Sequence, residues 1–273
     1  MTHPAPIPSL RVSVLMPVFN ERATIEHAIE RVRAVAMRLE IICVDDFSTD
    51  GTREKLAELE RSGAIDVLVL HERNQGKGSA VRSALERASG DVIVIQDADL
   101  EYDPGDILRL IAPVEDGRAD AVFGSRFKGD VNRVLYYWHS LGNWGLTTLS
   151  NMLTNLNVSD METCYKLVKT DLMKSLPLTS DRFGFEPELT ARLAQSRARI
   201  YEVPISYSGR TYAEGKKIGW SDGVAAIWHI IRFNLLSSKA PVYRSSEAAT
   251  RHAPQQHAVS ESSSASAAAA LPR

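Results

Sequence analysis

Short apolar runs alternate with amphipathic segments along the first part of the chain. The runs are continuous, as expected of buried strands, and lie at 11–16, 40–44, 66–70, 92–95 and 119–123. The segments between them place apolar residues at helical spacing, at 20–32, 53–61, 79–88 and 104–114. Strands that alternate with helices predict an α/β, Rossmann-like fold with a mostly parallel central sheet and helices on both faces.

The second part of the chain is richer in aromatic residues and less regular. We expect helices at 133–156, 185–194 and 220–238, a strand at 199–203, and a return to the sheet at 163–168. Residues 1–10 are expected to be a flexible N-terminus, and 239–273 a disordered tail rich in Ser, Ala, Gln and Pro. One domain is therefore expected over 11–238, with halves at 11–126 and 127–238.

Composition and charge narrow the class of protein. The 44% hydrophobic and 24% charged residues are typical of a globular chain, and a net charge of −2 offers no basic field for nucleic acid. Cys43 and Cys164 form no CxxC pair, and Cys43 lies in an apolar strand pattern, so a reduced, buried thiol is expected there. Neither a signal peptide nor a run of ~18 apolar residues is visible, so a cytoplasmic location is expected, with peripheral membrane contact left open.

Polar clusters follow four of the predicted strands or the turns after them. They are Asn20/Glu21, Asp45/Asp46, Gly76/Lys77 and Asp97/Asp99. Because ligands bind at the carboxyl ends of parallel strands, these clusters predict a binding site at one edge of the sheet. No GxGxxG follows the first strand and no GxxxxGK[ST] occurs, which disfavours a standard dinucleotide fold and a Walker ATPase.

An acidic motif ends the fourth apolar run. If the chain stays extended there, Asp97, Asp99 and Glu101 point to the same face of the strand. Oxygen ligands of this kind suit Mg²⁺ or Mn²⁺, usually shared with substrate phosphates. The alternative is a solvated acidic turn, and Glu101 in particular has the alternative of a solvated loop carboxylate.

Several motifs together resemble family 2 glycosyltransferases with the GT-A fold. The motifs are 17–21 (PVFNE), 44–52 (VDDFSTDGT), 74–78 (NQGKG) and 96–100 (QDADL). The segments 124–127 and 160–166 also resemble the branch that contains dolichyl-phosphate mannosyltransferase and polyprenyl-phosphate glycosyltransferases, and the resemblance covers roughly residues 11 to 236. It implies transfer of a sugar, with inversion, from a nucleoside-diphosphate sugar such as GDP-mannose or UDP-glucose to polyprenyl or dolichyl phosphate.

The resemblance also implies roles for residues on the donor side. Asp97 and Asp99, with Glu101, would hold the metal, and three turns would bind the donor: Pro17, Phe19 and Glu21; Asp45 and Asp46; and Gly76, Lys77 and Gly78. Of the aspartate pair, Asp46 is the one expected at the nucleoside. Glu21 has the alternative of a first-turn helix carboxylate, and Lys77 that of a plain surface lysine.

Four cations are expected to bind phosphate groups: Arg126, Arg133, Arg210 and Lys216. The resemblance implies that the first two hold the acceptor phosphate, and the other two lie in a lid at 209–219 over the donor diphosphate. It also makes Asp160 the candidate general base, with a cap or turn aspartate as the alternative. Asp99, Asp160 and Arg126 are thus the expected catalytic residues.

Two rival functions and one question about partners stay open at this point. A phosphate acceptor is already largely dianionic near neutrality and needs no strong base, whereas a sugar hydroxyl of a polysaccharide or glycolipid would need one. A nucleotide-sugar-binding protein without catalysis is the non-enzymatic rival. The helix at 220–238 fits a membrane interface or core packing, and a chain without membrane spans would need a membrane-protein partner to move a lipid-linked product across a bilayer.

Overall fold

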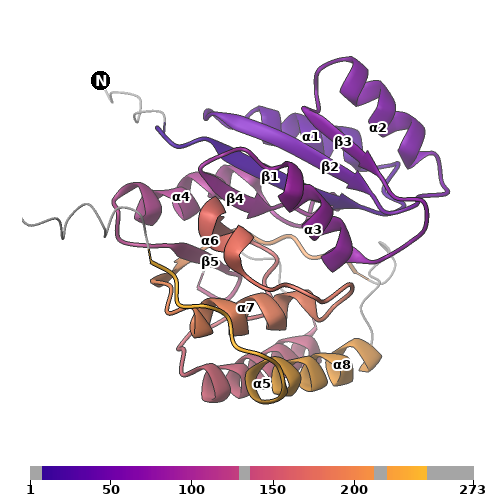
Figure 1. Cartoon of the computed structure of the whole chain (residues 1–273). Helices are drawn as coiled ribbons and strands as arrows, with labels where there is room; N and C mark the ends of the chain where they lie inside the picture. The colour runs from indigo at the N-terminus through magenta and orange to yellow at the C-terminus, as the bar shows by residue number, and fades with distance from the viewer. Residues whose placement is uncertain (1–7, 129–135, 212–219, 245–273) are drawn as a thin grey trace, which may run out of the picture. The chain divides into compact units, whose positions relative to one another are not determined.

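The computed structural model describes residues 8–128, 136–211 and 220–244, with the side chains of 220–222 left out. Its centre is a seven-stranded sheet in the order β3-β2-β1-β4-β6-β5-β7, with helices on both faces (Figure 1). Only β6 runs antiparallel to its neighbours. The strands are β1 (Val12–Val18), β2 (Leu39–Asp45), β3 (Val67–Leu70), β4 (Val92–Ile95), β5 (Ala121–Ser125), β6 (Lys166–Lys169) and β7 (Ile200–Pro204). The prediction of a mostly parallel sheet is confirmed.

The helices connect these strands and form a separate layer in the second half of the chain. They are α1 (Ile25–Arg33), α2 (Thr52–Arg61), α3 (Lys77–Arg87), η1 (Pro104–Asp106), α4 (Ile107–Glu115), α5 (Tyr137–Thr154), α6 (Thr170–Ser175), α7 (Phe185–Gln195), α8 (Trp220–Ile231) and the π-helical turn η3 (Arg232–Leu236). The short helix α6 was not predicted.

Continuous apolar strands explain where the core lies. In β1, β2 and β4 nearly every residue is buried on both faces of the sheet, as expected of strands covered by helices on each side. The edge strand β3 is only partly buried. The apolar runs therefore locate strands at the centre and at the edge of the sheet, but full burial is confined to the central strands.

The register of the parallel strands brings their carboxyl ends to one edge. Val18, the last residue of β1, pairs with Asp45 at the end of β2, and Leu15 pairs with Ile95 at the end of β4. The polar segments that follow β1, β2 and β4 consequently start from the same edge of the sheet. β5 runs in the same direction as these strands, and Arg126 directly follows it.

Helices α5, α7 and α8 pack on one another (Figure 1). They belong to the second half of the chain, whereas the strand-end acids come from the first. Within the described residues, no helix combines the length and apolar character needed to cross a membrane.

The folded part of the chain extends past the predicted boundary at residue 238. Ala240 is buried and its backbone N–H donates to Gln195 Oε1 at 2.9 Å. The Tyr243 hydroxyl donates to Asp171, 2.8 Å from Oδ2. The segment 239–243 therefore belongs to the fold, and the rest of the predicted tail lies outside the described residues from 245 on.

Two glycines at the start of α3 allow another segment of backbone to approach. A Cβ on Gly78 would lie 2.1 Å from the carbonyl oxygen of Ser180, and one on Gly76 would lie 2.4 Å from that of Asp181. Gly76 also has a φ of +94°, which favours glycine. These glycines thus allow the backbone of residues 180–181 of the same chain to approach α3, and a donor contact at this turn stays a prediction.

We expect Gly78→Ala to lower the free energy of unfolding by about 2 kcal/mol, because its Cβ would overlap the Ser180 carbonyl and force the backbone apart. The measurement is urea unfolding followed by circular dichroism. Gly142→Ala, in α5, is the matched control: no atom lies within 4 Å of its Cβ position. That variant should gain up to ~1 kcal/mol from helix propensity. Equal stability of the two variants would contradict the packing argument.

Candidate active site

The chain turns after β4 instead of continuing as a strand. Residues 98–100 form a turn, and Leu100 has a φ of +65°. The alternation expected for Asp97, Asp99 and Glu101 therefore does not apply, and within the described residues no group of three acidic, His or Cys side chains is arranged to hold a metal ion. The structure therefore does not show the predicted arrangement in which three carboxylates point to one metal site.

Glu101 is instead bonded to the segment that follows β7. Its Oε2 accepts a hydrogen bond from the Tyr207 hydroxyl at 2.7 Å, and its Oε1 accepts one from the backbone N–H of Arg210 at 2.8 Å. The Glu101 carbonyl also accepts from the Ser208 N–H at 2.8 Å. Glu101 thus fixes the start of the predicted lid.

Asp97 and Asp99 fit a divalent ion as a pair. Burial, and then the charges of Asp97 and Glu101, raise the pKa of Asp99 to about 7. Mg²⁺ is commonly held by one or two carboxylates together with substrate phosphates, and such a pair offers that donor set.

Two cations already contact this carboxylate pair. Arg210 Nη2 lies 3.1 Å from Asp99 Oδ2, and its Nη1 lies 3.6 Å from Glu21 Oε2. Lys77 Nζ lies 3.1 Å from Asp97 Oδ1. The structure therefore brings together five of the predicted donor-side residues, from α3, from the segments after β1 and β4, and from the start of the lid.

Lys77 is a partly buried cation rather than a surface lysine. Only 23% of its side chain is exposed, and besides Asp97 its ammonium contacts Glu186 Oε1 at 3.0 Å and Cys164 Sγ at 3.1 Å. Burial by itself would lower the pKa of Lys77, but the charges of Asp97 and Glu186 raise it well above its usual value. Lys77 thus carries a fixed positive charge beside the candidate metal pair.

Asp45 and Asp46 lie at the predicted strand end but are bonded within the protein. Asp46 accepts the backbone N–H groups of Gln75 at 2.8 Å and Gly76 at 2.7 Å, and its Oδ1 lies 2.8 Å from His71 Nδ1. Asp45 Oδ2 accepts from Arg53 Nε at 2.8 Å. Both carboxylates therefore shape the surrounding turns, and a nucleoside contact for either stays a prediction.

The segment after β1 is tied to the segment after β2. Thr49 N–H donates to Asn20 Oδ1 at 2.8 Å, and Glu21 N–H donates to Thr52 Oγ1 at 3.0 Å. Pro17 lies within β1, and Phe19 is exposed at its end. The three predicted residues of the first donor-binding turn are thus held next to the second turn.

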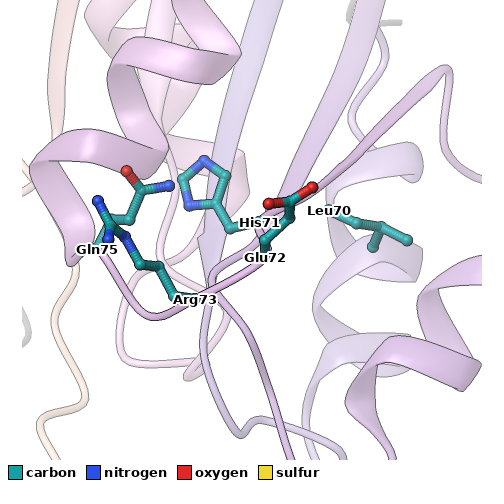
Figure 2. Close-up of a pocket in the computed structure, with 5 residues that line it drawn as sticks. All are labelled: Leu70, His71, Glu72, Arg73 and Gln75. Carbon is teal, nitrogen blue, oxygen red and sulfur yellow. The ribbon is translucent and has the colours of Figure 1, made fainter.

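A polar surface pocket of about 400 Å³ lies beside Asp46. It is lined by Leu70, His71, Glu72, Arg73 and Gln75, and Figure 2 shows Arg73 and Gln75 on one side and Glu72 and Leu70 on the other. None of these residues was predicted as a site residue. His71 and Gln75 both bond Asp46, so the pocket adjoins the turn that Asp46 organises.

Arg126 and Asp160 form a buried, two-pronged ion pair. Arg126 Nε lies 2.7 Å from Asp160 Oδ2, and its Nη2 lies 2.7 Å from Oδ1. Asn143 of α5 contacts both partners, and Arg126 lies over the Tyr207 ring, 5.1 Å from its centre. Burial by itself would raise the pKa of Asp160, but Arg126 lowers it below its usual value. A fully buried carboxylate with this pKa is a weak base.

Two of the predicted cations, Arg133 and Lys216, lie outside the described residues. Of the predicted cationic set, the structure therefore places only Arg126 and Arg210. Arg126 follows β5, whereas Arg210 lies at the start of the lid segment next to the candidate metal pair.

Sequence reasoning did not assign the buried charges between Lys77 and Arg126. Burial, and then the charge of Glu186, raise the pKa of Glu162 to about 7. Its Oε1 is buried without a hydrogen-bond partner among the described residues. Lys166 is fully buried and donates to the carbonyls of Met161 and Thr163. The hydrophobic periodicity of the sequence does not predict a functional role for Glu162. The only indication in the sequence is that Glu162 lies close to Asp160.

The family model of glycosyl transferase family 2 matches residues 13–176, which is more than half of the chain. The chain belongs to glycosyl transferase family 2. By family it is a glycosyltransferase, and the predicted resemblance is confirmed. The strand-end acids, the glycine-rich turn and the Arg126–Asp160 pair all lie within the matched segment.

Curated relatives of this family 2 chain carry hexosyltransferase and polyprenyl-phosphate names. It is 32% identical to the low-salt glycan biosynthesis hexosyltransferase Agl6 of Haloferax volcanii, over 85% of this chain but 54% of the relative. It is 30% identical to the undecaprenyl-phosphate mannosyltransferase of Micrococcus luteus, over 83% of this chain and 95% of the relative. The chain spans little more than half the length of the first relative and 63% of the dodecaprenyl-phosphate galacturonate synthase of Rhizobium johnstonii.

Solved structures confirm the GT-A fold of the chain. Glucosyl-3-phosphoglycerate synthase from Mycobacterium tuberculosis, in complex with Mn²⁺, UDP and glucosyl-3-phosphoglycerate, superposes with a TM-score of 0.65 at 22% identity. The match covers 84% of this chain and 82% of that one. At this identity the likeness concerns the fold alone.

The raised pKa of Glu162 predicts a pH-dependent stability. Between its ordinary value of 4.5 and about 7, the folded state of this glycosyltransferase holds a proton that the unfolded state releases. The contribution of Glu162 is fully present below pH 4.5 and is lost as the pH rises through 7. Relative to Glu162→Gln, the wild type should lose on the order of 2 kcal/mol of unfolding free energy over this range.

Urea unfolding of both proteins at several pH values measures this difference. Glu58→Gln, which alters an exposed glutamate on α2, is the control and should show no comparable trend. A constant difference between the wild type and Glu162→Gln across the range would contradict the raised pKa.

Proposed function

We propose that the chain transfers a sugar, with inversion, from a nucleoside-diphosphate sugar of the GDP-mannose or UDP-glucose type to a polyprenyl phosphate. The observation that carries the proposal is the Arg126–Asp160 pair after β5, in a chain 30% identical to an undecaprenyl-phosphate mannosyltransferase. The donor side supplies Asp97, Asp99 and two cations, and the acceptor side supplies a rigid guanidinium.

The donor-side charges suit a leaving diphosphate. A Mg²⁺ or Mn²⁺ ion held by Asp97 and Asp99 would neutralise negative charge that grows on the diphosphate as the bond to the sugar breaks. Lys77 contacts Asp97, and Arg210 contacts Asp99. Both keep their positive charge, and Arg210 is carried by a segment that Glu101 anchors.

Arg126 suits a phosphate acceptor. Its guanidinium is planar and always charged, and such a fork matches phosphate oxygens in pairs. Asp160 fixes its orientation through two contacts of 2.7 Å, and 17% of the Arg126 side chain is exposed. Asp160 then acts as a positioning residue for Arg126, in place of the base role first expected for it.

The weak basicity of Asp160 favours phosphate over a hydroxyl as the nucleophile. A phosphate monoester dianion can attack the sugar without losing a proton, whereas a hydroxyl needs a base within reach. Asp160 has both oxygens bonded to Arg126 and a lowered pKa. It therefore contributes little as a base.

One observation favours a second candidate function, transfer to a sugar hydroxyl. Glu162 has a pKa of about 7 and a buried oxygen without a hydrogen-bond partner among the described residues. A general base works best when its pKa lies near the working pH. Glu162 is the residue that would take that role if the acceptor were a polysaccharide or glycolipid.

Transfer assays with labelled GDP- and UDP-sugars, undecaprenyl phosphate and Mg²⁺ or Mn²⁺ test the proposal. We expect metal-dependent transfer to the lipid, lowered at least ~100-fold in Asp99→Ala. Asp160→Asn should mainly raise the KM for the lipid phosphate, because Arg126 loses its orientation. Glu162→Gln should stay within a few-fold of wild type, since a phosphate needs no base.

Asp116→Asn, at an exposed position, is the control and should leave transfer unchanged. Donor hydrolysis without lipid transfer, together with transfer to a sugar hydroxyl that Glu162→Gln abolishes, would replace the first candidate by the second. Nucleotide binding without turnover of any donor would contradict both.

A second prediction concerns metal binding without nucleotide. Because the Arg210 guanidinium lies 3.1 Å from Asp99, it competes for the charge that a metal would use. We expect Arg210→Ala to bind Mn²⁺ about tenfold more tightly in the absence of donor. The same variant should bind the donor with Mn²⁺ more weakly, because a cation facing the diphosphate is lost.

Calorimetry and the electron paramagnetic resonance of free Mn²⁺ measure both affinities. Arg118→Ala removes an exposed arginine that pairs with Asp116, and this control should change neither. Unchanged Mn²⁺ affinity in Arg210→Ala would show that Arg210 does not compete with the metal.

A further inference from the structure

Tyr207 lies between the donor side and the acceptor side of the candidate site. Its hydroxyl donates to Glu101 Oε2 at 2.7 Å, in the segment that carries Asp99. Its ring lies against the guanidinium of Arg126, whose Cζ is 5.1 Å from the ring centre. Tyr207 was not among the predicted site residues. One side chain thus contacts both the acidic turn after β4 and the acceptor-side arginine.

The pairing of β5 with β7 explains why these two side chains meet. The strands are parallel, and Ser125 at the end of β5 pairs with Pro204 at the end of β7. The chain stays beside β5 past this point, since the Ile205 N–H donates to the Ser125 carbonyl at 3.1 Å. Arg126 follows β5 directly and Tyr207 follows β7 closely, so both leave the sheet at the same edge.

Two buried tyrosines hold the Tyr207 ring in place. Tyr102 lies against it with the ring centres 5.4 Å apart, and Tyr165 stacks on Tyr102 at 5.1 Å. The Tyr102 hydroxyl accepts a hydrogen bond from the Cys164 N–H at 3.1 Å, and the Tyr165 hydroxyl donates to Gln96 Oε1 at 2.8 Å. Packing and hydrogen bonds thus fix the two inner rings, and these restrict the movement of Tyr207 away from Arg126.

The Tyr207 hydroxyl is a lasting donor to Glu101. Burial, and then the charge of Glu101, raise the pKa of Tyr207 above its usual value. The phenol therefore keeps its proton at neutral pH. The other oxygen of Glu101 accepts the backbone N–H of Arg210 at 2.8 Å. One carboxylate therefore holds both Tyr207 and the residue whose guanidinium contacts Asp99.

The aromatic ring complements the ion pair of Arg126 with Asp160. Asp160 binds the edge of the guanidinium through Nε and Nη2, whereas Tyr207 contacts its face. The edge contacts set the direction of the fork, and a ring against the face limits its tilt. Phosphate oxygens also bind arginine in the guanidinium plane, so the ring does not compete with them.

We propose that Tyr207 is a positioning residue for the acceptor phosphate. It holds the Arg126 guanidinium in its binding orientation and joins it, through Glu101, to the segment that carries Asp99. The role in the reaction rests on the proposed phosphate acceptor, but the contact with Arg126 can be measured without any substrate.

Nuclear magnetic resonance of the full chain with ¹⁵N-labelled arginine tests the contact. The Nε–H signal of Arg126 is identified as the one that Arg126→Lys removes. It should move downfield in Tyr207→Leu, because the ring no longer shields it, and stay near its wild-type place in Tyr207→Phe, which keeps the ring. Tyr201→Leu is the matched control: Tyr201 contacts Arg118 in the same way, at 5.5 Å, and its loss should not move the Arg126 signal.

Steady-state transfer to a short, water-soluble prenyl phosphate tests the role in the reaction. Tyr207→Leu should raise the KM for the prenyl phosphate about tenfold and leave the KM for the donor within about twofold. Tyr207→Phe should raise the acceptor KM by only about threefold, because the ring stays and the bond to Glu101 is lost. A merely structural role would change both KM values alike or lower the amount of active enzyme. Tyr201→Leu should change neither KM.

The outcomes separate this proposal from the proposed function. An Arg126 signal that Tyr207→Leu leaves in place would overturn the positioning contact, as would a wild-type acceptor KM in both Tyr207 variants. Either result leaves the proposed transfer to a prenyl phosphate standing. A wild type that transfers to no prenyl phosphate would overturn the proposed function and, with it, the acceptor role of Tyr207. Circular dichroism checks that each variant is folded, and Tyr207→Phe keeps the test decisive if Tyr207→Leu does not fold.

Discussion

The contact of Lys77 with Asp97 and Glu186 joins the two halves of the chain at the candidate site. Its ammonium lies 3.1 Å from one carboxylate, after β4, and 3.0 Å from the other, in the first turn of α7. This contact depends on the approach of 180–181 to the start of α3, which Gly76 and Gly78 permit. A side chain at either glycine would push α7 away from α3. Lys77 would then lose a partner while remaining a partly buried cation, which is costly.

From Lys77 the charges alternate through the interior toward Arg126. Asp97 and Glu186 contact Lys77, Glu162 and Lys166 lie in the fields of Glu186 and of each other, and Asp160 binds Arg126. Glu162 is the carboxylate whose pKa is raised most clearly in this series. Burial, and then the charge of Glu186, raise it to about 7 although Lys166 and Arg126 oppose the shift. The positive and negative charges of this series nearly cancel when Glu162 is protonated. A substrate phosphate at Arg126 would therefore interact with individual nearby charges and not with a large net charge.

The sequence predicts the sheet well because its evidence is local. A continuous apolar run such as Val92–Ile95 needs only its own residues to be recognised, and parallel order follows from the alternation with helices. The site is predicted less well because its partners are distant in sequence. That Glu101 bonds Tyr207, or that Asp160 is held by Arg126, depends on a turn at Leu100 and on the packing of α5. The position of Asp46 directly after a strand is predicted correctly. Sequence spacing does not reveal, however, that its carboxylate accepts hydrogen bonds from the backbone N–H groups of Gln75 and Gly76.

The two proposed substrates differ in solubility, and the fold offers each a different surface. The donor-side residues follow β1, β2 and β4 at a polar edge of the sheet, where a nucleotide sugar can arrive from water. Arg126 is also at a strand end, but α5 packs against it with Asn143, and the outward side of α5 is apolar. An arginine at the sheet's polar edge with no apolar neighbour would serve a soluble phosphate equally well. The feature that favours a lipid phosphate is therefore the pairing of Arg126 with an uncharged, tryptophan-bearing helix, and the charge on the arginine alone does not decide it.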